Sequence, residues 1–170
     1  MHLKAFQILA GDTNIGIDLA QGNDWVADAV STIHRRLPGC SLLIPPTVLE
    51  ELAWLAAHAE ENAVCTAARE FLRQHRTWGF QLLHTVPLGD AYVAKIAERL
   101  LKSGILPAPE MNDAQVLAES AALGCSVLLT SDEHLRAIDF QRLSFELAPF
   151  DVGAPVIATP REIVRKFFRA

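Results

Sequence analysis

The sequence has no hydrophobic run long enough to cross a membrane. A transmembrane helix needs roughly 20 consecutive apolar residues, and no stretch of this chain approaches that length. The first residues also lack the A-x-A pattern of a signal-peptide cleavage site. We therefore expect a cytoplasmic protein that has no membrane partner.

Cysteines are few and lack any useful spacing. Cys40, Cys65 and Cys125 are odd in number, far apart and set among apolar residues. This pattern excludes a disulfide framework and a cysteine-based metal site. We expect three reduced cysteines that pack in the core.

The sequence also lacks a surplus of positive charge. It has 15 Lys and Arg against 20 Asp and Glu, for a net charge of −5. Proteins that bind nucleic acids are usually basic, so the overall charge argues mildly against such a partner. A carboxylate cluster that holds cations would itself add negative charge, which the bound cations offset. A nuclease is therefore not excluded.

The length and the order of elements indicate the fold. The 170 residues, 51% of them hydrophobic, are enough for one domain with a sizeable core, so we expect residues 1–170 to form a single domain. Strands are predicted at 3–10, 41–44, 81–86, 126–130, 144–147 and 155–158, and helices at 25–37, 47–59, 63–78, 90–102, 112–123, 133–138 and from 160 onward. This alternation predicts an α/β fold, a three-layer α/β/α sandwich with a central, mostly parallel sheet.

Two aspartates stand at the ends of predicted strands. Asp12 directly follows the first strand, and Asp132 follows the strand that ends at Thr130. Ligands of parallel sheets bind beyond the carboxyl ends of the strands, so both aspartates lie where a site is expected. Aspartate is also favoured as a helix N-cap, and this alternative remains open for each of them.

Helix geometry separates two adjacent glutamates. Thr47 and Glu50 have the spacing of a capping box, in which Glu50 reaches back to the start of its helix. Glu51 lies beside Val48 and Leu55 at the edge of the apolar stripe. Burying a carboxylate there is costly unless it is paired or binds metal. Glu51 is therefore the functional candidate.

Another aspartate opens a later helix. Asn112 suits the N-cap of this helix, with Gln115 at the capping-box position. Asp113 would gain from the helix dipole in the first turn, which is one explanation for it. It also shares a face with Val116 and Leu117 and so points toward the interior.

Clustered acids of this kind predict a cation. Without one, mutual repulsion would keep some of them protonated. Ligand sets made only of oxygen suit Mg²⁺ or Mn²⁺. Such ions activate water in phosphodiester cleavage, and a deprotonated carboxylate can assist as general base.

The order of these motifs resembles the PIN-domain family, which includes the VapC-like toxins of toxin–antitoxin pairs. The matching segments are Asp12-Thr13-Asn14, Pro46 to Leu52, Asn112-Asp113-Ala114 and Leu128 to Asp132, and together they span nearly the whole chain. The resemblance implies a PIN-like fold. It also implies a Mg²⁺- or Mn²⁺-dependent endoribonuclease that hydrolyses phosphodiester bonds of RNA, as the toxin of a type II pair. The alternative is a non-catalytic RNA-binding or interaction module on the same fold.

The resemblance also implies residue roles and partners. Asp12, Glu51, Asp113 and Asp132 match the catalytic acids, and Asp12, Asp113 and Asp132 match the metal ligands. Thr130 and Asn14 match supporting positions, with Thr13 as an alternative to Asn14. The second position after Asp132 is acidic in many members but is His134 here, so one or two ions remain open. An RNA substrate, an antitoxin and a homodimer are the implied partners.

Basic and aromatic residues outside these motifs have two interpretations. For the basic residues, the favoured interpretation is that they lie on helix faces exposed to solvent, and the alternative is that they contact RNA phosphates. For the tryptophans, core packing is favoured over base stacking. The residues are Arg69, Arg73 and Arg76 on one helix, Arg161, Arg165, Lys166 and Arg169 on the last helix, and Trp25, Trp54 and Trp78.

Overall fold

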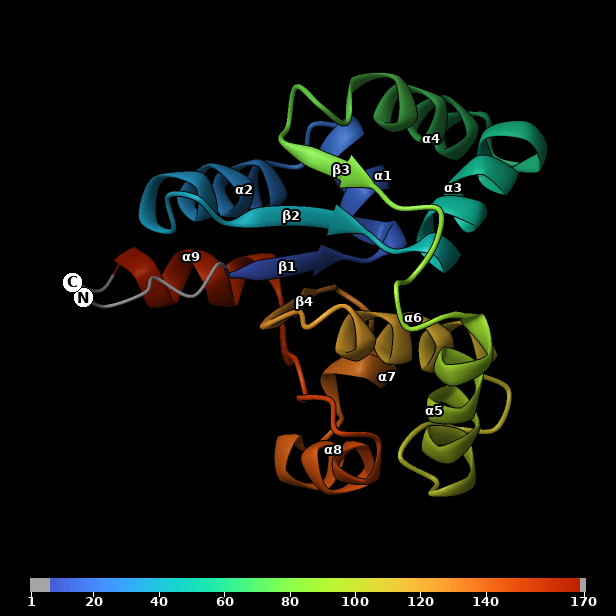
Figure 1. Cartoon of the computed structure of the whole chain (residues 1–170). Helices are drawn as coiled ribbons and strands as arrows, with labels where there is room; N and C mark the ends of the chain where they lie inside the picture. Colours follow the sequence, from blue (N-terminus) through green and yellow to red (C-terminus); the bar gives the residue numbers. More distant parts are fainter. Residues whose placement is uncertain (1–6, 169–170) are drawn as a thin grey trace.

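The strands form one sheet in which every pairing is parallel. The computed structural model describes residues 7–168. Within this range the strand order across the sheet is β3-β2-β1-β4-β5 (Figure 1). The strands are β1 (Ile8–Gly11), β2 (Ser41–Ile44), β3 (Phe80–Leu82), β4 (Val127–Leu129) and β5 (Val156–Ala158). The predicted parallel sheet is confirmed.

Helices connect the strands and cover both faces of the sheet. They are α1 (Thr13–Ala20), α2 (Asp24–Arg36), α3 (Pro46–His58), α4 (Asn62–Gln74), α5 (Asp90–Lys102), α6 (Met111–Ala122), α7 (Glu133–Arg136), α8 (Phe140–Leu147), the 3-10 helix η1 (Ala148–Phe150) and α9 (Pro160–Phe168). The chain runs outward from β1 to β2 and β3, then returns past β1 to β4 and β5. Because parallel crossovers are right-handed, the connections before and after this return lie on opposite faces. The predicted α/β/α layering is therefore confirmed.

The reversal of direction places a crevice between β1 and β4. These two strands are neighbours, but the connections that leave them diverge to opposite sides of the sheet. In open α/β sheets, ligands bind at such a point, beyond the carboxyl ends of the strands. The fold thus predicts the site directly after Gly11 and Leu129.

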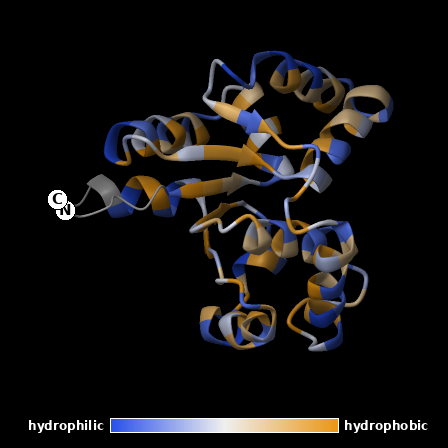
Figure 2. Ribbon diagram, in the orientation of Figure 1, coloured by the Kyte–Doolittle hydropathy of each residue, from blue (hydrophilic) through white to orange (hydrophobic). Residues whose placement is uncertain are grey.

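The core is built from the apolar strands and the inner helix faces (Figure 2). Leu9, Leu42 and Leu128 on three neighbouring strands are fully or almost fully buried. On one face, α1 packs closely against α4 at Gly16, where an added Cβ would lie 3.1 Å from the Phe71 ring. A larger residue at this position would push α1 away from α4 and disturb the segment that follows β1.

Some predicted elements differ from the structure. The strand expected at 144–147 is wrong, because Asp139 caps helix α8 by accepting a hydrogen bond from Arg142 N, 2.8 Å away. Leu143 and Leu147 are then buried at helical spacing. The helix predicted to reach residue 78 ends at Gln74, and residues 3–6 of the first predicted strand lie outside the described range.

The last helix begins as predicted. Thr159 N donates to a Glu162 carboxylate oxygen at 2.7 Å, and Glu162 N donates to Thr159 Oγ1 at 3.2 Å. This reciprocal pair is a capping box. It fixes the start of α9, which packs against α2.

The structure tests the expectations of reduced core cysteines and of a chain without membrane-spanning segments. All three cysteines are free; Cys125 is buried, and burial raises its thiol pKa to about 12. Cys40 is partly buried and packs against the core, whereas Cys65 is only partly buried, so the prediction of three core cysteines is wrong for Cys65. Among residues 7–168, no helix combines the length and the apolar character that a membrane span requires.

Candidate metal centre and active site

Asp12 and Asp132 meet at the carboxyl ends of β1 and β4. The strands are in register at Gly11 and Leu129, and Asp12 N donates to Leu129 O at 3.0 Å. Asp12 also caps α1 by accepting from Thr13 N at 2.7 Å, and Asp132 caps α7 by accepting from Leu135 N at 3.0 Å. The two explanations offered for these aspartates therefore coexist. Each aspartate caps a helix with one carboxylate oxygen and also lies at the carboxyl end of its strand.

A small polar network holds Asp12 in place. Thr130 is fully buried and donates from Oγ1 to Asp12 Oδ2 at 2.7 Å. Asn14 Nδ2 donates to the same oxygen at 3.1 Å, and its Oδ1 accepts from Ser131 N at 3.0 Å. Thr130 Oγ1 also accepts from Asp132 N at 3.0 Å. One hydroxyl and one amide thus bind the Asp12 carboxylate to the backbone that carries Asp132.

Glu51 and Glu50 differ in the way that the helical spacing predicts. Glu51 is partly buried, and its Oε2 accepts from Thr13 Oγ1 at 2.5 Å. Glu50 is exposed. The pKa of Asp12 is raised first by burial and then by repulsion from Glu51 and Asp132, so these carboxylates are close enough to interact. Thr13 is therefore a partner of Glu51 through its side chain and of Asp12 through its backbone.

The predicted capping box of Thr47 and Glu50 is wrong. Helix α3 has no side-chain capping bond at its N-cap residue, Pro45. Thr47 instead donates from its backbone N and its Oγ1 to the carboxylate of Glu119, at 3.0 and 2.8 Å. This contact joins residues 72 positions apart and fastens the start of α3 to α6.

Glu119 was missed by the sequence reasoning. It is 3% exposed, and burial raises its pKa, while its hydrogen bonds with Thr47 oppose the rise. An acid between the apolar residues Ala118 and Ala121 was the available signal, because a buried carboxylate needs partners. Its contact with Thr47 positions the helix that carries Glu51 against the helix that carries Asp113.

Asp113 lies at the first turn of α6 and faces the other acids. Its pKa is raised to about 7, first by burial and then by repulsion from Asp132, Asp12 and Glu110, while His134 opposes the rise. Its Oδ2 is buried and has no hydrogen-bond partner among the described residues. A buried carboxylate oxygen without a donor fits a bound cation or an ordered water as its partner. The capping box expected for this helix is wrong, because Glu110 is the N-cap and makes no side-chain capping bond.

A second group of ligand atoms adjoins Asp113. Glu110, Asp113 and His134 each offer one ligand atom, and these atoms all lie within 4.8 Å of one another. His134 Nδ1 is 3.0 Å from Glu110 Oε1. Glu110 was missed by the sequence reasoning, although it stands only three positions before Asp113, at the N-cap of the same helix. These three residues could hold a metal ion.

The donor chemistry of the site fits a hard divalent cation. Carboxylate oxygens are the ligands that Mg²⁺ and Mn²⁺ prefer. Four carboxylates from separate segments meet here, and we call them the acidic cluster: Asp12, Glu51, Asp113 and Asp132. Burial and mutual repulsion raise the pKa of Asp12 and Asp113, and a cation would relieve both effects.

Comparison with known proteins supports the fold at the level of structure only. No protein-family model and no curated protein matches this sequence. The chain is similar to a chain of the crystal structure of VapBC2 from Rickettsia felis bound to a DNA fragment from their promoter, with a TM-score of 0.63 and 14% sequence identity. The match covers 90% of this chain and 98% of that chain. At this identity the likeness shows a shared PIN-like α/β/α fold, and membership of the family remains a prediction.

Proposed function

We propose that this protein is a Mg²⁺- or Mn²⁺-dependent endoribonuclease. The observation that carries the proposal is the convergence of Asp12, Glu51, Asp113 and Asp132 at the crevice between β1 and β4, where one buried oxygen of Asp113 has no hydrogen-bond partner within residues 7–168. Acids in such an arrangement can hold the cations that promote hydrolysis of phosphodiester bonds. The order of the motifs and the fold shared with the VapBC2 chain support the same activity.

The residues divide into roles according to their contacts. Asp12, Asp113 and Asp132 would hold the cation, which when bound would polarise the phosphate and activate water. Glu51 enters from α3 and is held by Thr13, so it is the candidate to accept a proton from the attacking water. Thr130 and Asn14 hold Asp12 and are positioning residues. Glu110 and His134 could complete a second cation site with Asp113.

The biological setting is part of the same proposal. The fold shared with a VapBC2 chain and the VapC-like motif order support a toxin that is paired with an antitoxin. RNA is the proposed substrate, a homodimer is the proposed assembly, and the whole chain would act as one domain in the cytoplasm. A small DNA-binding protein encoded in the neighbouring reading frame would support the pairing.

A circular single-stranded RNA tests the activity, because only an endonuclease can open a circle. We expect linear products with Mg²⁺ or Mn²⁺ and none with EDTA. Glu51→Gln should abolish cleavage and Glu50→Gln should not, although the two residues are adjacent and lose the same charge. Absence of cleavage with every divalent cation would instead favour the non-catalytic module. An equal loss of cleavage in Glu51→Gln and Glu50→Gln would show that Glu51 has no specific role in the mechanism.

A further inference from the structure

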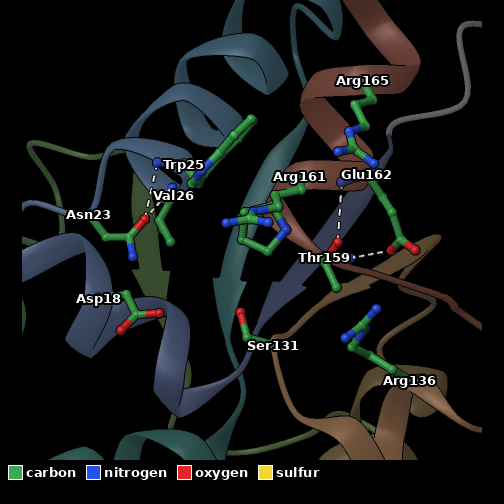
Figure 3. Close-up of a pocket in the computed structure, with 11 residues that line it drawn as sticks. Asp18, Asn23, Trp25, Val26, Ser131, Arg136, Thr159, Arg161, Glu162 and Arg165 are labelled. Atoms are coloured by element: carbon green, nitrogen blue, oxygen red, sulfur yellow. Dashed lines mark hydrogen bonds between the residues drawn. The ribbon is translucent and has the colours of Figure 1, made fainter.

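A second cleft lies beside the acidic cluster, and its lining carries three arginines against two acids. Its volume is about 430 Å³, within the range of pockets that hold small molecules. We call it the arginine cleft. Among the residues that line it are Asp18, Trp25, Ser131, Arg136, Arg161 and Arg165 (Figure 3).

Ser131 connects the arginine cleft to the acidic cluster. It lines this cleft and also a neighbouring hollow formed with Asn14, Asp132 and His134. Its backbone N donates to Asn14 Oδ1, the residue that also binds Asp12. The two hollows therefore meet at Ser131, and a strand bound at the acids would reach the arginine cleft past this residue.

The guanidinium groups of the cleft are available for anions. Arg136, Arg161 and Arg165 are exposed, and none makes an ion pair with a carboxylate within the described part of the chain. Glu162 also lines the cleft, but its carboxylate is engaged in the capping box with Thr159. Since the acidic cluster repels a phosphate strand, unpaired positive charge beside it is what would attract one.

An aromatic surface stands beside these charges. Trp25 is 40% exposed, so the prediction that it packs in the core is wrong. The Arg161 guanidinium lies 5.0 Å from the centroid of its ring, and Figure 3 shows Arg161 reaching toward Trp25 from α9. Aromatic and guanidinium planes are the surfaces on which unpaired RNA bases stack. On the wall opposite Arg136 and Arg165, Asp18 supplies an acceptor for base N–H groups.

We propose that the arginine cleft binds a nucleotide of single-stranded RNA next to the bond at the acidic cluster. The base stacks on the Trp25–Arg161 pair, and the flanking phosphates contact Arg136 and Arg165. This inference rests on the proposed ribonuclease function, because it takes RNA as the ligand. A double helix fits less well, because its stacked bases leave no free face for Trp25.

Binding without metal tests the cleft separately from cleavage. A fluorescent oligouridylate is titrated with the protein in EDTA and followed by anisotropy. Arg161→Ala combined with Arg165→Ala should weaken binding by about tenfold and flatten its salt dependence. The matched control is Arg73→Ala combined with Arg76→Ala, which removes the same charge from the distant α4 region and should leave affinity unchanged.

Stacking on Trp25 has its own signal. RNA should quench the intrinsic fluorescence, and Trp25→Phe should remove the quenching while keeping most of the affinity. Trp25→Ala should weaken binding roughly 5- to 150-fold. Trp54→Phe is the control, since Trp54 lies outside the residues that line the cleft, and it should preserve the quenching.

Four results would overturn the proposal. They are wild-type affinity in the Arg161 and Arg165 double variant, an equal loss in the control double variant, quenching that persists in Trp25→Phe, and equal affinity for polyglutamate of the same charge. RNA bound through the cleft but never cleaved would reject the ribonuclease and keep the cleft. Cleavage of RNA together with unchanged RNA affinity in the Arg161 and Arg165 double variant would keep the ribonuclease and reject the cleft.

Discussion

The acidic cluster and the arginine cleft lie on either side of Ser131 and are built in different ways. The acids are held from within, since Asp12 is 6% exposed and accepts hydrogen bonds from Thr13, Asn14 and Thr130. The arginines are exposed, and their guanidinium groups have no carboxylate partner among the described residues. The difference fits the two proposed roles, because hydrogen-bonded carboxylates suit the binding of a cation and exposed guanidinium groups suit contact with the phosphates of an RNA strand.

The largest expected effect comes from removing an acid at the centre of the cluster. Loss of a group that merely supports a metal ligand costs about 10- to 100-fold in activity, so Asp12→Asn should reduce the RNA cleavage rate by more than about a hundredfold. RNA affinity in EDTA should be equal or higher, because a repelling charge is lost. The RNA cleavage rate and the RNA affinity of this one variant therefore separate the role of the acidic cluster from that of the arginine cleft.

The control for this variant is Asp28→Asn on the exposed face of α2, which loses the same charge and should cleave RNA normally. Cleavage by Asp12→Asn at the wild-type rate would show that the acidic cluster is not catalytic. Weaker RNA binding by this variant would show that the cluster and the cleft are not independent.

A smaller effect is expected from the hydroxyl that holds the cluster together. Thr130→Val removes the donor to Asp12 Oδ2 and the acceptor for Asp132 N. We expect about a 10- to 100-fold loss of activity and a loss of about 1–3 kcal/mol of stability, because buried groups are left without partners. The concentration of Mn²⁺ needed for half-maximal activity should rise, and the KM for RNA should not change.

Thr130→Ser keeps the hydroxyl and should restore both activity and cation affinity. If Thr130→Val loses stability but keeps its wild-type response to Mn²⁺, Thr130 is a structural residue only and does not position a metal ligand.

The acidic cluster could be predicted because its signals are local. Asp12 and Asp132 follow strands directly, and the choice of Glu51 over Glu50 depends on the spacing of one helix. Glu119 could not be assigned in the same way, because its partner Thr47 is 72 positions away. The parallel sheet was likewise predictable from alternation, whereas the four residues at 144–147 were too few to distinguish a strand from the end of α8.

The arginine cleft could not be assembled from the sequence. Arg161 and Arg165 share one helix and were recognised as a basic face. Trp25 and Arg136 come from other elements, and only the packing of α9 against α2 brings Trp25 to Arg161. Patterns within one element predict which residues share a face, but they do not predict which two faces form a cleft.

Burial of Asp113, together with repulsion within the acidic cluster, predicts a pH-dependent stability when no metal is present. Because the pKa of Asp113 is raised from 3.8 to about 7, the folded state binds more protons than the unfolded state between these values. Stability should therefore fall as pH rises from about 4 to 7. The shift corresponds to at most about 4 kcal/mol, and partial exposure of Asp113 reduces the expected cost to about 1–2 kcal/mol.

Asp113→Asn removes this cost. In EDTA at pH 8 its Tm should exceed that of the wild type by about 2–8 °C, and the difference should vanish near pH 4. Mg²⁺ should raise the Tm of the wild type and not that of the variant. Asp28→Asn serves as the control for the loss of one carboxylate, and a Tm gain of equal size in that variant would attribute the effect to net charge instead of the cluster.

The smallest expected effect concerns one arginine at the edge of the cleft. Arg136 lies on α7, the short helix that Asp132 caps, so it is the cleft cation nearest in sequence to the acids. Removing one phosphate contact on a single strand lowers the salt slope by about 0.7, so a fourfold rise in salt should weaken wild-type binding about threefold more than Arg136→Ala binding. The salt dependence of oligouridylate affinity in EDTA measures this slope. An unchanged slope would place Arg136 outside the path of the RNA, and a reduced slope together with a reduced kcat would mean that the cleft also aligns the bond to be cut.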